Sequence, residues 1–157
     1  MAINRNNLTK IERIIYDNFT DYLLLAGGRA TKDEAVLDIF KNIKAGNAIA
    51  VEDDGLVCLF TQDLNYIARF DIFSDNHSFK MITSGQKITK FLFEETGIRF
   101  VYGYSTNKKM VRAIERGGWK YMGTMPESYW DGEKFIDQYM FGVSKKEFFE
   151  FLEKKKS

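Results

Sequence analysis

The segment from Lys80 to Lys87 has the residue types of an anion site at the start of a helix. The free amides and the dipole of a helix beginning at Thr83 would attract a phosphate, and Gly85 would allow it close approach. The alternative is that Thr83 and Gln86 form a capping box on a surface helix. Local sequence favours this alternative, because a capping box already satisfies two of the amides that a phosphate would use. The candidate residues for the anion site are Lys80, Thr83, Ser84, Gly85, Gln86 and Lys87.

Three titratable side chains could assist proton transfer or bind a cation. His77 is the only histidine, and its intrinsic pKa would suit a general base, although histidines in polar loops are commonly just solvated. Asp71 alternates with Phe70 and Ile72 in an expected strand, so it either points into a cleft or pairs with Arg69. Asp137 interrupts an aromatic strand and must be paired or exposed, since an unpaired buried charge is costly.

Aromatic and basic residues in the last third of the chain can each be interpreted in two ways. Tyr129 and Trp130 could form the wall of a substrate pocket, or they could be ordinary core and edge aromatics. Lys108 and Lys109 begin a basic helix face that is either solvated or an anion site. The single cysteine, Cys58, lies in an apolar strand pattern and reads as a small core residue.

Composition limits the class of protein. The 157 residues suffice for one domain, which we expect to span residues 1–157. A net charge of +1 gives no electrostatic reason to expect binding to nucleic acid or to a membrane surface. No apolar run reaches the ~18–20 residues that a membrane span needs, and the polar start predicts no signal peptide. We therefore expect a soluble, cytoplasmic protein; one His and one Cys cannot build the usual zinc sites.

The helices and strands that would position these residues follow from periodicity and capping signals. A first helix is expected from Thr9 to Leu25 and a second from Thr31 to Gly46, each opened by a Thr-x-x-Glu capping box. Later helices are expected from Thr83 to Gly97, after Asn107, and after a Ser144–Glu147 cap. The expected strands are 48–52, 56–60, 64–73, 98–104, 119–125 and 135–143, and the segment 127–130 leads from the fifth strand to a turn at Asp131-Gly132.

This pattern predicts an α+β fold with the order α-α-β-β-β-α-β-α-β-β-α. Asp53-Asp54-Gly55 joins the first two strands and is a strong hairpin signal. The first three strands are most simply an antiparallel meander, and the rest of the sheet follows a helical connection. The segment 98–119 reads as strand, turn, helix, two glycines and an aromatic residue, Trp119.

The order of elements resembles the GNAT acetyltransferase superfamily. Members often carry Asn after the fifth strand and Gly-Phe about a dozen residues later, where this chain has Asn107 and Gly118-Trp119. The segment from Asp131-Gly132 to Asp137 is similar to that of ribosomal-protein N-terminal acetyltransferases. An altered phosphate loop and a missing tyrosine, described below, resemble compact phage-encoded GNAT-like proteins.

The resemblance implies that acetyl-CoA binds in a V between the third strand and the strand 98–104, and that an amine attacks the thioester directly. Pyrophosphate would rest at the Thr83 helix, with Asn107, Lys108 and Lys109 near the cofactor. Pantetheine would run along Phe70–Phe73, and an amide near Ile72 or Phe73 would stabilise the oxyanion. The amine acceptor would be a protein or a small molecule, bound near Asp71, Tyr129, Trp130 and Asp137. The protein could also form a homodimer.

The chain departs from the family pattern at three positions. Thr83 stands where the first glycine of the phosphate loop belongs, Ile114 at the usual general-acid tyrosine, and Met110 at an alternative serine. A catalytic protein would then need another acid, such as Tyr104, Ser105 or a water molecule. The alternative function is a GNAT-like binding or structural protein that has lost catalysis.

Overall fold

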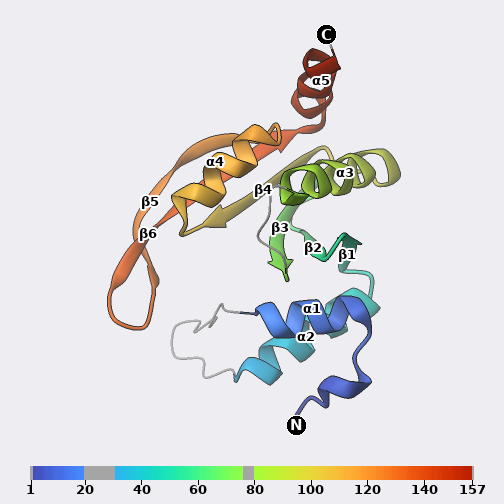
Figure 1. Cartoon of the computed structure of the whole chain (residues 1–157), viewed down its shortest axis with the longest axis vertical. Helices are drawn as coiled ribbons and strands as arrows, with labels where there is room; N and C mark the ends of the chain where they lie inside the picture. The colour runs from blue at the N-terminus through green and yellow to red at the C-terminus, as the bar shows by residue number, and fades with distance from the viewer. Residues whose placement is uncertain (1, 20–30, 76–79, 157) are drawn as a thin grey trace.

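The protein is described by a computed structural model that covers residues 2–19, 31–75 and 80–156. Its centre is a six-stranded sheet in the order β1-β2-β3-β4-β6-β5, with helices on both faces (Figure 1). The order of α-helices and strands is the predicted one, preceded by a short 3-10 helix, Arg5–Asn7. The bounds are α1 Lys10–Asn18, α2 Lys32–Lys44, β1 Ala48–Asp53, β2 Leu56–Gln62, β3 Ile67–Ser74, α3 Lys80–Glu95, β4 Phe100–Ser105, α4 Lys108–Arg116, β5 Lys120–Trp130, β6 Phe135–Ser144 and α5 Lys145–Lys156.

One face of the sheet is covered by α1 and α2 over strands β1, β2 and β3. Alternate strand residues point to opposite faces, so Val57 and Leu59 of β2 pack with Phe73 of β3 against these helices. Their buried partners are Ile14 and Ile15 of α1 together with Val36 and Phe40 of α2. No residue of β4, β5 or β6 belongs to this cluster in the described chain.

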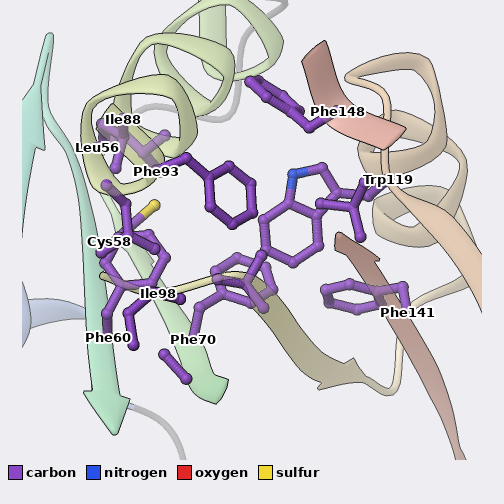
Figure 2. Packing of buried hydrophobic residues seen from close by; sticks show 14 of the residues in the cluster. Leu56, Cys58, Phe60, Phe70, Ile88, Phe93, Ile98, Trp119, Phe141 and Phe148 are labelled. Carbon is purple, nitrogen blue, oxygen red and sulfur yellow. The ribbon is translucent and has the colours of Figure 1, made fainter. Parts of the chain in front are cut away.

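The opposite face carries α3, α4 and α5 around an aromatic core. Trp119 packs between Phe70 of β3 and Phe141 of β6, with ring centroids 4.3 Å and 5.9 Å from its own (Figure 2). Phe93 of α3 lies 5.8 Å from Phe148 of α5. Because these rings come from elements far apart in the sequence, they hold the two halves of the sheet together.

The hairpin signal and the caps expected at Thr9, Thr31 and Ser144 are confirmed. Asp54 and Gly55 have φ of 50° and 82° between the paired residues Asp53 and Leu56, which is a two-residue primed turn. Strands β1, β2 and β3 form the predicted antiparallel meander. The reciprocal Thr9–Glu12 capping box is present, and the side chains of Thr31 and Ser144 accept hydrogen bonds from the amides of Glu34 and Glu147.

Two predicted boundaries were wrong near the beginning of the chain. Helix α1 ends at Asn18, and Phe19 already has an extended conformation, because its ring stacks on Phe73 in the core. The rest of the segment expected to reach Leu25 lies outside the described residues. Strand β3 begins at Ile67, so Leu64 and Tyr66, with 65% and 61% of their surface exposed, precede it in the connection.

The third helix also begins earlier than predicted. It includes Lys80, Met81 and Ile82, so Thr83 lies inside the helix rather than at its N-cap. The physical reason is tertiary, because Met81 packs against the main core and Ile82 contacts the α4 side. Residues 76–79, which include His77, lie outside the described residues.

Strand β5 is longer than the expected 119–125, because it continues through the segment 127–130 to Trp130. Its pairing with β6 shifts between Tyr121 and Gly123 and again between Met125 and Tyr129. The second irregularity places Glu127 at φ 48°, and its amide donates a 2.9 Å hydrogen bond to Asp137. Asp137 therefore stabilises a β-bulge, which answers how a carboxylate fits in this aromatic strand.

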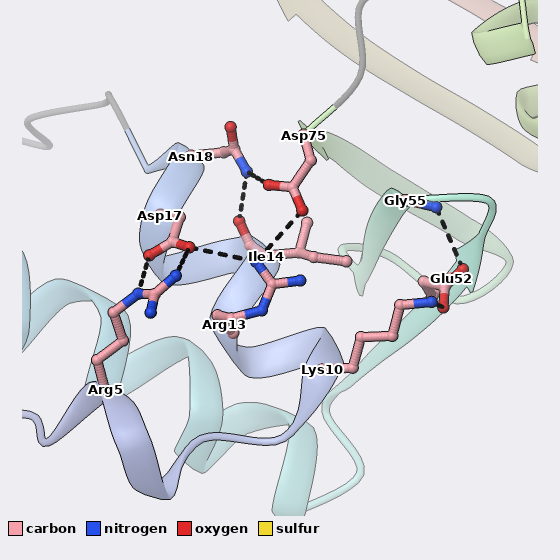
Figure 3. Close-up of polar contacts among 9 residues, drawn as sticks. All are labelled: Arg5, Lys10, Arg13, Ile14, Asp17, Asn18, Glu52, Gly55 and Asp75. Carbon is pink, nitrogen blue, oxygen red and sulfur yellow. Dashed lines mark hydrogen bonds and ion pairs between the residues drawn. The ribbon is translucent and has the colours of Figure 1, made fainter.

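A polar network connects α1 to the end of β3 (Figure 3). Both carboxylate oxygens of Asp17 accept hydrogen bonds from Arg5, at 2.8 and 2.7 Å. Arg13 bridges Asp17 and Asp75, 3.3 Å from each, and Asn18 donates to Asp75 at 2.7 Å. These bonds, led by that from Arg5, lower the pKa of Asp17 from its ordinary value of 3.8 to about 2.

No helix in the described residues is both long and apolar enough to cross a bilayer.

We expect Asp17→Asn to destabilise the protein in a pH-dependent way. Because the pKa of Asp17 is lower in the folded state, its stabilisation is fully present above about pH 4 and is lost as pH falls toward about 2. The difference in free energy of unfolding between wild type and variant, measured in urea, should shrink across that range. A difference that stays constant with pH would contradict the ion-pair account, and Asp38→Asn on the exposed face of α2 is the control.

Candidate active-site cleft

The candidate site forms where two parallel strands separate. Strands β3 and β4 pair only through Ile67–Phe100, Ala68–Val101 and Arg69–Tyr102. Both strands continue, to Ser74 and Ser105, but beyond Arg69 no further parallel pair forms. Backbone groups of β3 past this point therefore face a gap between the strands that a ligand can enter.

A large side chain packs against β4 where the two strands separate. A Cβ atom placed on Gly103 would lie 2.5 Å from Cε1 of Phe70 and 3.0 Å from its carbonyl oxygen. The Phe70 ring thus occupies the space beside β4, and it is fixed there by Trp119 and Phe141. Only glycine leaves room for the ring at this point.

A first cavity of about 530 Å³ opens between α3 and α4, above β2 and β3. Its walls are mainly apolar, and its only charged lining residues in the described chain are Lys109 and Arg116. Gln86 also lines it, and the Nε2 atom of Gln86 is buried without a hydrogen-bond partner among the described residues. The lining includes Leu56, Cys58, Phe70, Ile72, Met81, Ile82, Gly85, Thr89, Asn107, Met110, Ala113, Ile114, Gly117 and Trp119.

A second cavity of about 320 Å³ lies on the α1 side of the same gap. It shares Phe70, Ile72, Met81, Met110 and Ile114 with the first cavity, so the two are neighbours along one cleft. Its charged lining residues are both carboxylates, Asp17 and Asp71. Asn18, Phe73, Ser74, Tyr104, Ser105 and Phe141 complete it. The cleft is therefore cationic on the α3–α4 side and carries carboxylates on the α1 side.

Two groups near the cleft are unsuited to proton transfer at neutral pH. Burial raises the pKa of the Cys58 thiol to about 12, so it is an inert core residue as predicted. Burial and a 2.6 Å hydrogen bond to Asp63 raise the pKa of Tyr102 to about 12. The protonated Tyr102 is held by Asp63, on the sheet face that carries Tyr104.

The structure brings many of the predicted site residues to this cleft. The second cavity contains the expected group of Asp71, Ile72, Phe73, Tyr104 and Ser105. The first contains Gly85, Gln86, Asn107 and Lys109, besides Ile72. The oxygen of Asn107 accepts a 2.9 Å hydrogen bond from the amide of Lys109 and caps α4, and Ser105 accepts one from the amide of Asn107.

Other predicted residues of the helix α3 lie away from the cavities. Thr83 and Lys87 are exposed inside the helix, Ser84 is buried in it, and neither cavity is lined by any of the three. Lys80 lies 3.9 Å from Asp54, across from the β1–β2 turn. The expected Thr83 helix terminus is thus wrong, because Lys80, Met81 and Ile82 before it already belong to the helix.

The remaining candidates are spread over the β5–β6 hairpin and α4. Lys108 extends over the ring of Tyr139, 5.6 Å from its centroid, and does not line either cavity. Trp130 is half exposed and packs on Phe135 at 4.9 Å. Neither it nor Tyr129 nor Asp137 lines the cleft.

Sequence reasoning missed several lining residues. Met110 and Ile114 were noted only as departures, and Arg116 only as part of a basic face. These residues are on the stripe of α4 that faces α3, together with Ala113 and Gly117. Their spacing in the sequence predicts that they share one face of the helix. The local sequence does not show that another helix lies opposite this face across a cavity.

Several solved structures of acetyltransferases have a similar architecture. The spermidine N-acetyltransferase from Vibrio cholerae in complex with CoA and spermine is 18% identical, covers 92% of this chain and 88% of its own, and has a TM-score of 0.64. A GNAT-family acetyltransferase from Streptococcus pneumoniae is 16% identical over 85% of this chain and 90% of its own, with a TM-score of 0.59.

The chain has the GNAT acetyltransferase fold. A ribosomal L7/L12 α-N-protein acetyltransferase in complex with coenzyme A also shares this fold, at 15% identity over 72% of this chain and 71% of its own, with a TM-score of 0.58. No family model matches the sequence, and no curated protein matches it. The splayed β3–β4 pair is the part of the GNAT fold in which the cleft lies.

We expect Gly103→Ala to destabilise the protein by about 1–3 kcal/mol, because the added methyl group overlaps Phe70 and overpacks the core. Gly85→Ala is the matched control, since its Cβ meets nothing within 4 Å and alanine favours the helix by up to about 1 kcal/mol. Urea unfolding of the two variants measures the contrast. Equal stability of Gly103→Ala and wild type would show that Phe70 is not held against β4.

Proposed function

We propose that this protein is an N-acetyltransferase that uses acetyl-CoA and transfers the acetyl group to a primary amine by direct attack. The observation that carries the proposal is the charge separation along one cleft. Lys109 and Arg116 line the α3–α4 cavity, and Asp17 and Asp71 line the adjoining cavity on the α1 side. An anionic donor and a cationic amine would approach from opposite sides and meet at the gap between β3 and β4.

The first cavity suits the pantetheine and phosphate parts of CoA. Its apolar walls match the pantetheine chain, and β3 beyond Arg69 offers backbone groups for the pantetheine amides. The buried Nε2 of Gln86 supports the same assignment, because an unsatisfied buried donor costs about 1–3 kcal/mol that a ligand carbonyl would recover. Pyrophosphate would approach the first amides of α3, and Lys109 and Arg116 would bind the 3′-phosphate.

The reaction needs little covalent help from the protein. The ammonium group would first lose a proton to water, and the neutral amine nitrogen would attack the thioester carbonyl carbon. The oxyanion would accept a hydrogen bond from the amide of Ile72 or Phe73, and the nitrogen would lose a second proton to water as the amide forms. Collapse of the tetrahedral intermediate would break the carbon–sulfur bond and release the CoA thiolate. Asp71 would orient the incoming amine.

Proton transfer is the step for which the cleft offers few side chains. Met110 and Ile114 form the wall shared by the two cavities, and neither can donate a proton. Ser105 and Tyr104 are the hydroxyl groups that line the second cavity beside them. We propose that one of these, or water that enters the gap, protonates the thiolate. His77 stays a candidate general base outside the described residues.

The apolar Met110–Ile114 wall also favours a second candidate function, a GNAT-like protein that binds its ligand without catalysis. Both functions require the cleft to bind CoA. They differ in whether an amine causes release of free thiol.

Binding of acetyl-CoA tests the proposal first. Ligand at ~100 times its Kd should raise the free energy of unfolding by about 2.7 kcal/mol if only the folded state binds. Gly85→Glu should weaken binding at least tenfold, because it places a negative charge in the first cavity, and Gly85→Gln controls for side-chain size. Absence of any melting shift at millimolar acetyl-CoA would overturn the proposal, and binding without thiol release would favour the non-catalytic protein.

A second prediction concerns the 3′-phosphate. Lys109→Ala combined with Arg116→Ala should weaken CoA binding by about tenfold at low salt, and should affect dephospho-CoA much less. Arg112→Ala is the control, because Arg112 is exposed on the same helix and lines neither cavity. Calorimetric titration of each variant measures the effect. Equal losses for CoA and dephospho-CoA would place the 3′-phosphate elsewhere.

A further inference from the structure

The wall shared by the two cavities is apolar in the described part of the chain. Five residues line both cavities, and none of them has a charged or hydrogen-bonding side chain: Phe70, Ile72, Met81, Met110 and Ile114. They come from β3, α3 and α4. The proposed reaction uses backbone amides of β3 at this point and gives these side chains no role.

Four of the five side chains keep accessible apolar surface. Ile72, Met81 and Ile114 are partly buried and pack against the main core, and Met110 is also only partly buried. Phe70 is the buried member of the set. Apolar surface that remains accessible inside a cleft favours an apolar ligand, because contact with such a ligand removes the surface from water.

Met110 and Ile114 form an apolar strip along α4. They are four residues apart, so they share one face of the helix and are separated by about 6 Å along its axis. The single methyl group of an acetyl thioester can contact one end of this strip but cannot cover it. With carbon–carbon bonds of about 1.5 Å, an acyl chain of roughly four to six carbons spans it.

The strip lies where the acyl group of a bound thioester would be held. In the proposed reaction the thioester oxygen is bound by the amide of Ile72 or Phe73, and the Ile72 side chain belongs to the shared wall. Carbon atoms beyond the thioester carbonyl would follow this wall into the second cavity. Its volume of about 320 Å³ is roughly ten times the ~30 Å³ that a water-sized group occupies, which leaves room for several methylenes beside an amine.

We propose that the protein binds an acyl-CoA with an unbranched apolar acyl group of roughly four to six carbons more tightly than acetyl-CoA. Met81, Met110 and Ile114 contact the acyl chain, and flexible methionine side chains adapt to its shape. In the transfer, the amine nitrogen bonds to the acyl carbonyl carbon, the carbon–sulfur bond breaks, CoA leaves as the thiolate, and the nitrogen loses its protons to water. This inference rests on the proposed function, because it requires CoA in the cleft.

Calorimetric titration tests the proposal without a known acceptor. The full chain is titrated with CoA, acetyl-CoA, butyryl-CoA and hexanoyl-CoA. Because each buried methylene contributes about fourfold in affinity, we expect butyryl-CoA or hexanoyl-CoA to bind at least tenfold more tightly than acetyl-CoA. A smaller gain, or tighter binding of acetyl-CoA, would overturn the inference and leave the proposed function intact. Failure of all four ligands to bind would instead overturn the proposed function.

Succinyl-CoA separates recognition of an apolar chain from recognition of its length. Its acyl group has the same number of carbons as butyryl but ends in a carboxylate, for which the shared wall has no hydrogen-bonding partner. We expect it to bind at least tenfold more weakly than butyryl-CoA. Equal affinity for the two ligands would show that the wall does not select apolar acyl groups.

Ile114→Ala and Ile82→Ala are matched variants, because Ile114 lines both cavities whereas Ile82 lines the first and not the second. Ile114→Ala should reduce the gain in affinity from acetyl-CoA to hexanoyl-CoA at least fivefold, with little change for CoA itself. Ile82→Ala should leave that gain unchanged. Ile114→Val should act in the same direction to a smaller extent, and it keeps the test available if the alanine variant fails to fold. An equal loss for CoA and every acyl-CoA would show that Ile114 contacts pantetheine instead, and would contradict the proposal.

Discussion

The close contact between the Phe70 ring and β4 at Gly103 ties the aromatic core to the point at which the cleft opens. A parallel pair of strands normally continues its hydrogen bonds to the ends of both strands. Here the ring fills the space beside Gly103, and Trp119 and Phe141 hold it there. The strands separate after three residue pairs, and the gap is supported by the same aromatic core that joins the halves of the sheet.

The helices on either side of the gap give its two openings different electrostatic character. On the α4 side, Lys109 and Arg116 are on the stripe that faces α3, so the larger cavity has a cationic rim. On the α1 side, Asp17 enters the lining but remains held by Arg5. The GNAT fold supplies the gap, whereas these side chains are what adapts it to particular ligands, and fold alone does not specify them.

The candidate site was predictable to the extent that short segments kept their local structure. Asn107 caps α4 as its sequence context suggests, so Lys109 reaches the cleft as expected. The Thr83 signal failed because a cap motif competes with burial. Met81 packs against the main core and Ile82 contacts the α4 side, so the helix extends back to Lys80.

The sequence by itself determined the order of elements, the Asp54-Gly55 turn and the caps at Thr9, Thr31 and Ser144, because each depends on hydrogen bonds and backbone angles within a few residues. The sequence also showed that side chains of β4 alternate between the two faces of the sheet, but it did not show which of the two sets of side chains faces the core. Val101 is fully buried whereas Tyr104 is exposed, since only the packing of α3 and Trp119 against the sheet decides the inner face. Contacts between distant segments decided the separation of the strands, the cavities and the pairing of Asp17 with Arg5, and no local pattern encodes such contacts.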